Sequence, residues 1–276
     1  MPPRGGDPSH ALKMASALKG LVHAVNVTDG SRAVMRMSSL AVARLLLDQG
    51  IEPVLQMACR DRNRIAIQAD LLGAHALGIR NLLCLTGDPV RAGDQPKARP
   101  VNELESVRLL QQVTAFNSGE DPVKGDLADG PTDLFAGAAA DPQCSSWSGL
   151  LRRMERKKAA GARFIQTQMV MDASVLERFC REIAEPMELP VLVGVFLLKS
   201  ARNAGFINRM VPGACIPDNL IARLEAAADP AAEGIQIAAE QVQRYLGVAQ
   251  GVHLMAIKAE ERIPAILNQA GVNLPG

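Results

Sequence analysis

The sequence GIRNLLCLTGDP, residues 78–89, carries the pattern that decides the fold. Gly78 follows an amphipathic helical segment, and an apolar run, Leu82–Leu85, comes shortly after it. A glycine past a helix end adopts the left-handed conformation at little cost, so Gly78 is typical of a helix stop. A short run of Leu and Cys after such a stop predicts a strand that is covered on both faces.

The same unit of helix, glycine and short apolar strand recurs at Gly20, Gly50 and Gly161. Helices between strands indicate parallel crossover connections. Seven such units over this length predict an α/β fold, a (β/α)8 TIM barrel, in a single domain spanning residues 1–276. The predicted strands are Val22–Thr28, Val54–Cys59, Asn81–Thr86, Leu134–Ala139, Phe164–Met169, Val191–Phe196 and Val252–Ile257.

The first unit of the barrel is incomplete. A helix is expected to begin near Ser9, and only a Pro- and Gly-rich octapeptide precedes it, so we expect the first strand to be missing. The loop Asp88–Pro100 follows a strand and belongs on the catalytic face, whereas Ser118–Pro131 follows a helix and belongs at the opposite rim. Segments Asn219–Ala228 and Ala232–Leu246 predict a doubled helical layer. The buried face of the third helix is expected to contain Ile65, Ala69, Leu72 and Ala76.

Composition limits the class of protein. Hydrophobic residues make up 48% and charged residues 21%, which is typical of a globular chain and argues against disorder. The net charge of +1 and the 3% of aromatic residues favour neither nucleic acid nor an acidic membrane as a partner. The start has no signal-peptide pattern, and five widely spaced cysteines indicate a reducing compartment. We therefore expect a cytoplasmic protein.

Polar residues at strand ends are the candidates for a site, because a barrel builds its active site there. Alternation along the sixth barrel strand, the fifth present in this chain, places Gln166 and Gln168 on one face. Buried glutamines need partners, so a polar ligand in the barrel mouth is one interpretation and a backbone bond at the rim is the other. The candidates are Thr28-Asp29, Gln56, Arg60-Asp61-Arg62-Asn63, Thr86-Gly87-Asp88, Gln166, Gln168 and Lys199-Ser200.

Asp88 has two equally supported interpretations. Gly87 lets the backbone approach a ligand closely, and a carboxylate beside it can orient a cofactor or steer protonation. Alternatively, Asp88 forms an Asx turn before Pro89. For Arg60–Asn63, either Asp61 or Asn63 can cap the next helix, and the arginines can pair with acids or contact a phosphate.

Several site types are disfavoured. The four histidines are scattered without metal-ligand spacing, so we expect no metal. No G-x-G-x-x-G motif follows a strand, and no Walker A motif is present, which disfavours Rossmann and P-loop nucleotide sites.

The chain resembles the methylenetetrahydrofolate reductase family, in particular the branch fused to or associated with methyltransferases. The similar blocks follow the family's order over nearly the whole chain. They are Ala24–Asp29, Arg36–Ser38, Cys59–Asn63, Gln68–Ala74, Leu77–Asn81, Leu85–Pro89, Ala160–Gln168 and Gly251–Ala256.

The resemblance implies a (β/α)8 barrel that binds FAD at the carboxyl ends of its strands. It implies an oxidoreductase that passes a hydride from NAD(P)H through FAD to 5,10-methylenetetrahydrofolate and gives 5-methyltetrahydrofolate, in one-carbon metabolism and methionine biosynthesis. Asp88 would lie near the flavin pyrimidine edge as the catalytic residue. The implied cofactor-binding residues are Thr28, Gln56, Thr86, Gly87, Asp88, Arg156 and Lys157. The implied folate-binding residues are Gln168 and Lys199.

The chain also departs from the family pattern. The family's catalytic glutamate lies on the first strand shortly before a Pro-Pro, and here Pro2-Pro3 is preceded only by Met1. Gln56 and Thr86 stand where flavin-binding members have His and Arg, and Asp141 stands where they have His or Asn. The alternatives are therefore a truncated or inactive folate-binding accessory subunit and a pterin-dependent methyltransferase barrel. Expected partners are a folate substrate and either a second copy of the chain or an associated methyltransferase.

Overall fold

The structure is a computed structural model that describes residues 1–211 and 213–272. The chain divides into two compact units. The first comprises Met1–Ala138 and Arg156–Arg163, and the second comprises Ala139–Glu155 and the chain from Phe164 onward. The expectation of a single domain stays a prediction.

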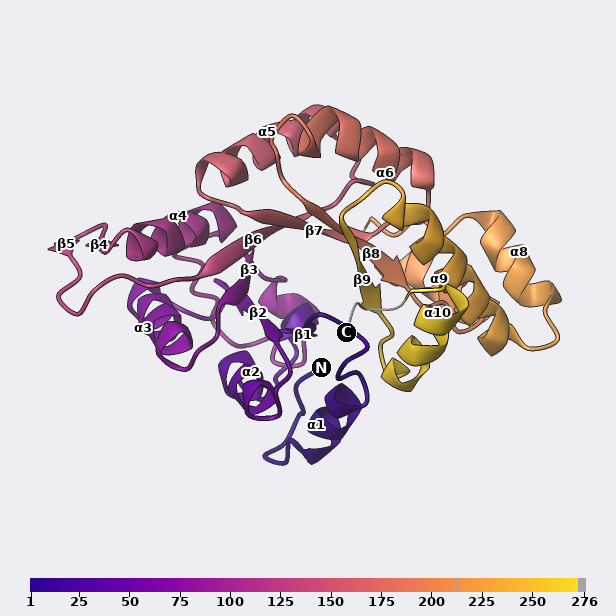
Figure 1. Ribbon diagram of the computed structural model, residues 1–276, viewed down its shortest axis with the longest axis horizontal. Helices are drawn as coiled ribbons and strands as arrows, with labels where there is room; N and C mark the ends of the chain where they lie inside the picture. Colours follow the sequence, from indigo (N-terminus) through magenta and orange to yellow (C-terminus); the bar gives the residue numbers. More distant parts are fainter. Residues whose placement is uncertain (212, 273–276) are drawn as a thin grey trace. The chain divides into compact units, whose positions relative to one another are not determined.

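The first unit is a parallel sheet with helices between its strands. Its strands pair in the order β1-β2-β3-β6, and every pair is parallel. In Figure 1, α2, α3 and α4 follow the strands in turn along one face of this sheet. The strands are β1 (Val25–Val27), β2 (Pro53–Ala58), β3 (Asn81–Leu85) and β6 (Phe135–Ala140), the last of which ends in the second unit. The helices are α1 (Ser9–Ser16), α2 (Ser39–Asp48), α3 (Arg64–Ala76) and α4 (Ser106–Asn117).

The predicted helix stops are confirmed. The four glycines of the recurring unit adopt left-handed backbone angles, with φ between +69° at Gly50 and +100° at Gly161. The predicted face of α3 is wrong, however, because Ile65 is 75% exposed and Leu72 is 41% exposed. The buried residues of α3 are Ile67, Leu71 and Ala74. Apolar residues occupy two stripes of this helix at the same spacing, so the period alone could not select the stripe that faces the sheet.

The second unit continues the same alternation. Its strands pair in parallel in the order β7-β8-β9. They are β7 (Phe164–Met169), β8 (Val191–Phe196) and β9 (Gly251–Met255). The helices are α5 (Trp147–Ala159), which ends in the first unit, α6 (Ala173–Phe179), α7 (Ala201–Met210), α8 (Asp218–Ala226), α9 (Pro230–Leu246) and α10 (Ile263–Gln269). A π-helical turn, Cys180–Ala184, extends α6.

The doubled helical layer of the second unit is confirmed. The helix α9 packs against β8 and β9, and α8 packs against α7 and α9 (Figure 1). An apolar cluster joins these helices to the carboxyl ends of two strands. Its buried members are Met169, Met171, Phe196, Leu198, Ala204, Ile207, Ile216, Leu224 and Ile237.

The long loops contain short elements that the sequence did not predict. Within 118–131, β4 (Glu120–Asp121) pairs antiparallel with β5 (Gly125–Asp126). The loop 88–100 contains a 3-10 turn at Val90–Ala92, and further 3-10 turns lie at Ser31–Ala33 and Glu260–Arg262.

The N-terminal segment is fixed to the first unit. The carbonyl oxygen of Pro2 accepts from Arg36 Nη1 at 2.9 Å, and that of Pro3 accepts from the N–H of Met37 at 2.8 Å. Arg4 forms an ion pair with Asp94 at 2.7 Å. Residues 2–4 therefore lie against the loops that follow β1 and β3.

The predicted fold class is confirmed. The part of the chain that the structure describes has an α/β fold of the TIM-barrel kind with seven parallel strands, and no strand precedes α1 within residues 1–8. In residues 1–211 and 213–272, no helix has both the length and the apolar character needed to cross a membrane.

Candidate functional site

The structure distributes the predicted site residues over both units. The second unit contains Gln168 and Lys199. The first unit contains Thr28, Gln56, Thr86, Gly87, Asp88, Arg156 and Lys157.

Asp88 lies on the exposed turn after β3, and its carboxylate bonds to the loop that follows β1. Its Oδ2 accepts from the backbone N–H of Arg32 at 2.5 Å. Asp94, six residues later, also bonds to the loop that follows β1, since its Oδ1 accepts from the N–H of Met35 at 2.9 Å. The carboxylate of Asp88 therefore bonds across to another loop rather than within its own turn, as an Asx turn would require.

Thr86 and Arg156 are connected through the first turn of α4. Thr86 Oγ1 accepts from the N–H of Ser106 at 3.2 Å. The side chain of Glu105 accepts from the N–H of Val107 at 3.0 Å and pairs with Arg156 at 3.4 Å. Carboxylates are favourable at a helix N-terminus, because the unpaired N–H groups there carry partial positive charge.

Lys157 follows Arg156 in the last turn of α5. Burial raises the pKa of the Cys84 thiol in β3, and the positive charge of Lys157 opposes that rise.

Gln56 and Thr28 place polar atoms inside the first unit. Gln56 is 9% exposed, and its Nε2 lies 3.5 Å from Asn26 Oδ1. Thr28 Oγ1 is buried and has no hydrogen-bond partner. A buried hydroxyl without a partner costs about 1–3 kcal/mol, so this atom is suited to bonding with a ligand.

The segment Arg60–Asn63 organises the loops around these residues. Arg62 pairs with Asp29 at 2.6 Å and with Asp70 at 2.8 Å. Burial works against the charge of Arg62, but its hydrogen bond to Asp29 and the negative charges of nearby aspartates together outweigh burial, and the pKa of Arg62 is raised. Asn63 caps α3 by accepting from the N–H of Ala66 at 3.0 Å. The arginines thus pair with protein groups, which was one of the two expected uses.

Gln166 and Gln168 do not share a face, contrary to the alternation expected for this strand. Gln166 is 4% exposed and its Oε1 is buried without a partner, whereas Gln168 is exposed. The pairing of β7 with β8 shifts between Gln166 and Met169. Such a bulge interrupts the two-residue period and turns the later side chains to the other side. Gln168 Oε1 accepts from the N–H of Met169 at 3.1 Å.

Lys199 lies beyond the end of β8. Its Nζ donates to the carbonyl oxygen of Ile257 at 2.6 Å, and its N–H donates to Asn203 Oδ1 at 3.3 Å. Asp141 follows β6 in the same unit, and burial raises the pKa of its carboxyl group. Gln143 joins this loop to the segment after β7, because its Oε1 accepts from the N–H of Met171 at 3.0 Å.

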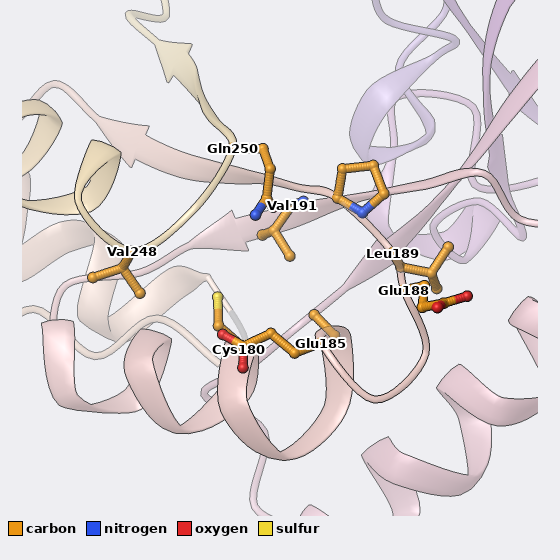
Figure 2. A pocket seen from close by; sticks show the side chains of 9 residues that line it. Cys180, Glu185, Glu188, Leu189, Val191, Val248 and Gln250 are labelled. Carbon is orange, nitrogen blue, oxygen red and sulfur yellow. Dashed lines mark hydrogen bonds between the residues drawn. The ribbon is translucent and has the colours of Figure 1, made fainter.

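A cavity of about 230 Å³ lies elsewhere in the second unit, at the amino end of β8 (Figure 2). Its wall is largely apolar, with Cys180, Val191 and Val248 facing it and Glu185 at its edge. Gln250, which also lines the cavity, already has a hydrogen-bond partner, because its Oε1 accepts from the N–H of Val191 at 2.8 Å. The cavity is at the opposite strand end from Gln168 and Lys199, so it is separate from the predicted folate residues.

Sequence reasoning did not single out Arg32, Asp94 or Ser106, although each bonds to a loop of the candidate site. The backbone N–H groups of Arg32 and Ser106 and the carboxylate of Asp94 each form a hydrogen bond with a residue that is distant in the sequence. The one available signal was Asp94, an acid within the long loop assigned to the catalytic face.

The sequence model of methylenetetrahydrofolate reductase matches residues 1–271. The chain belongs to the methylenetetrahydrofolate reductase family.

Relatives of the chain include a probable methylenetetrahydrofolate reductase (NADPH) of Caenorhabditis elegans, which is 26% identical over 85% of this chain and 35% of the relative. Methylenetetrahydrofolate reductase 2 of Schizosaccharomyces pombe is 24% identical over 90% of this chain and 40% of the relative. The chain thus spans about two fifths or less of the length of these curated relatives.

Solved structures share the fold. An uncharacterized protein from Clostridium thermocellum that binds two copies of 5-methyl-5,6,7,8-tetrahydrofolic acid aligns with a TM-score of 0.64 and 14% identity, over 98% of this chain and 91% of that one. Tryptophan synthase from M. tuberculosis aligns with a TM-score of 0.50 and 14% identity, over 99% of this chain and 91% of that one.

Proposed function

We propose that the protein is an oxidoreductase that transfers a hydride from NAD(P)H through FAD to 5,10-methylenetetrahydrofolate and gives 5-methyltetrahydrofolate. Two observations in the first unit carry the proposal: Asp88 presents an exposed carboxylate after β3, and Thr28, directly after β1, has a buried hydroxyl without a hydrogen-bond partner. Membership of the family supports the reaction.

The residues of the first unit fit FAD. Thr28 Oγ1 lacks a partner that a polar ring edge would provide, and Gln56 adds a buried amide. Arg156 and Lys157 are cations suited to the phosphates. A bound FAD would supply the hydride relay between NAD(P)H and the folate. Asp88 would hold its negative charge near the flavin ring and thereby tune how readily the ring accepts electrons.

The second unit would bind the folate. Gln168 is exposed and its amide can both donate and accept, which suits the edge of a pterin ring. Lys199 would contribute a cation, and the apolar cluster near the ends of β7 and β8 suits a flat ring. The Clostridium thermocellum protein, which has the same fold and binds a methylated folate, supports this assignment.

The test is cofactor uptake followed by turnover. The purified protein is titrated with FAD while flavin fluorescence is recorded, and NAD(P)H oxidation is then measured with methylenetetrahydrofolate. We expect saturable uptake, and a rate that falls about 10²-fold in Asp88→Asn, because that substitution removes the charge at the flavin while keeping the shape. Arg64→Gln, at an exposed ion pair of the same unit, is the control and should retain the rate. A protein that takes up no FAD overturns the proposal.

A second function is folate binding without flavin chemistry, as an accessory subunit. The folate complex of the Clostridium thermocellum protein favours it. It would be supported by calorimetric binding of 5-methyltetrahydrofolate to a colourless protein, with binding weakened in Gln168→Ala. Association with a second copy or with a methyltransferase, and a cytoplasmic location, stay predictions.

A further inference from the structure

Arg60 is a buried arginine of the first unit. It follows β2 by two residues, and only 4% of its surface is exposed. A guanidinium removed from water destabilises a protein unless its N–H groups have partners. Its partners should therefore account for its burial.

The guanidinium of Arg60 bonds to three segments. Its Nε and Nη2 donate to the two carboxylate oxygens of Asp61, at 2.8 and 2.5 Å. Its Nη1 donates to the carbonyl oxygen of Gly30 at 3.3 Å and to that of Asp88 at 3.4 Å. One side chain thus joins the loop after β1 to the loop after β3.

Two glycines make room for Arg60. A Cβ atom at Gly87 would lie 2.9 Å from Arg60 Cβ, and one at Gly30 would lie 2.8 Å from Arg60 Nη2. Both glycines have left-handed backbone angles, with φ of +95° and +50°. The turn Thr86–Asp88 and the turn at Gly30 are therefore shaped around the arginine.

The same two loops are joined again by the bond from the Arg32 N–H to Asp88 Oδ2, at 2.5 Å. Because Arg60 holds the carbonyl groups of Gly30 and Asp88, it fixes the backbone on both sides of that bond. We propose that Arg60 is a positioning residue that determines where the Asp88 carboxylate lies, acting through these two carbonyl groups. The inference deepens the proposed function, and only its flavin measurement rests on that function.

The chemistry of the side chain requires an arginine. Hydrogen bonding to Asp61 raises the pKa of Arg60, so the guanidinium stays charged. A lysine keeps the charge but lacks the planar fork that reaches a carboxylate and two carbonyl groups together. Lysine should therefore rescue the function of this residue only in part.

The first test measures amide hydrogen exchange of Arg32, which needs no cofactor. We expect exchange about tenfold faster in Arg60→Met, because the Asp88 carboxylate is no longer held within hydrogen-bond distance of the Arg32 N–H. Arg60→Lys should give an intermediate rate. Arg80→Met is the matched control. Arg80 Nη1 also donates to two carbonyl groups, of His75 and Ile79, but at the amino end of β3. Arg80→Met should leave the exchange rate of the Arg32 amide unchanged.

The second test is a double-mutant cycle on the midpoint potential of bound FAD. Arg60→Met and Asp88→Asn should each shift the potential in the same direction, and the double variant should shift it no further than Asp88→Asn alone. Additive shifts, or equal Arg32 exchange in Arg60→Met and Arg80→Met, overturn the inference. If Arg60→Met does not fold, Arg60→Lys decides, since exchange at the wild-type rate would overturn it. Failure of the wild type to bind FAD counts against the proposed function alone, because the exchange measurement still tests Arg60.

Discussion

The carboxyl ends of β2 and β3 in the first unit differ in kind from those of β7 and β8 in the second. In the first unit, arginine and aspartate side chains connect the loops, with Arg62 between Asp29 and Asp70 and Arg60 beside Asp61. In the second unit, apolar side chains such as Met169, Phe196 and Leu198 pack around the strand ends. Loops held by charge present many polar atoms, whereas apolar strand ends with few polar groups suit a flat ring.

This difference also determines how each unit responds to substitution. A buried ion pair fails when one partner is removed, because the other charge is left buried. A packed apolar cluster fails when volume is added or removed. Substitutions in each unit therefore test whether charge or apolar packing holds it together.

The largest effect is expected for Arg62→Met in the first unit. The side chain of Arg62 is 20% exposed and that of Asp29 is 11% exposed, so the substitution leaves the largely buried carboxylate of Asp29 without its ion-pair partner. We expect a loss of about 3 kcal/mol in the free energy of unfolding, measured by urea denaturation. Arg64→Met, at an exposed pair with Glu103, should cost about 0.5 kcal/mol or less. Equal losses for the two variants would contradict a first unit held by buried charge.

In the second unit, Gly234→Ala is expected to cost about 2 kcal/mol. A Cβ atom there would lie 1.8 Å from the carbonyl oxygen of Leu198, where α9 meets the chain after β8. The collision costs about 3 kcal/mol, and the better helix propensity of alanine offsets about 1 kcal/mol. Gly205→Ala, in α7, meets only the end of Arg209 at 3.6 Å and should be neutral or stabilising in the same urea experiment.

The first unit offers the same collision in a different setting. A Cβ atom at Gly93 would also lie 1.8 Å from a carbonyl oxygen, that of Ala33. Neither residue lies in an α-helix or in a strand of the sheet, so the backbone there yields at a lower cost than at α9, and Gly93→Ala should cost about 1 kcal/mol. If Gly93→Ala lowered the free energy of unfolding more than Gly234→Ala does, the loops of the first unit would be less tolerant of added volume than the packed helix of the second.

A pH effect is expected in the second unit. Burial lowers the pKa of His253, in β9, to about 4, and its Nδ1 has no partner. The unfolded chain therefore takes up the proton first as the pH falls below about 6.5. Stability is complete above that pH and declines towards pH 4, by about 1.4 kcal/mol per pH unit at most. His253→Gln should flatten the stability curve between pH 6.5 and 4, whereas His10→Gln, at an exposed site, should not.

The smallest effect on stability is expected for Thr28→Val. Its buried hydroxyl has no partner, so its removal relieves the cost of an unsatisfied group and should raise the free energy of unfolding, by up to about 1 kcal/mol. FAD affinity should fall about tenfold if this hydroxyl bonds to the cofactor. Thr132→Val is the contrast, because Thr132 Oγ1 donates to Asn117 Oδ1 at 2.7 Å and its loss should cost about 1 kcal/mol. A marked loss of stability in Thr28→Val would show a structural role instead.

The strands could be predicted well because their signals are local. The bounds of β7 and β8 agree with the predicted ones, and the glycine stops lie where expected. The buried stripe of α3 could not be predicted, because Ile65 and Ile67 both belong to apolar stripes of the right period. The bulge in β7 was also missed, since no single residue type requires it, and it separated Gln166 from Gln168.

The order of strands and helices could be predicted from local sequence patterns, and so could the position of Thr86-Gly87-Asp88 at a strand end. Those features follow from spacing and from the conformations that glycine permits. Only the tertiary structure showed that Asp88 bonds to Arg32 and that Arg60 joins the loops on either side. These contacts depend on left-handed backbone at Arg32 and Ala33, with φ of 59° and 54°, which arises from packing between loops far apart in the chain.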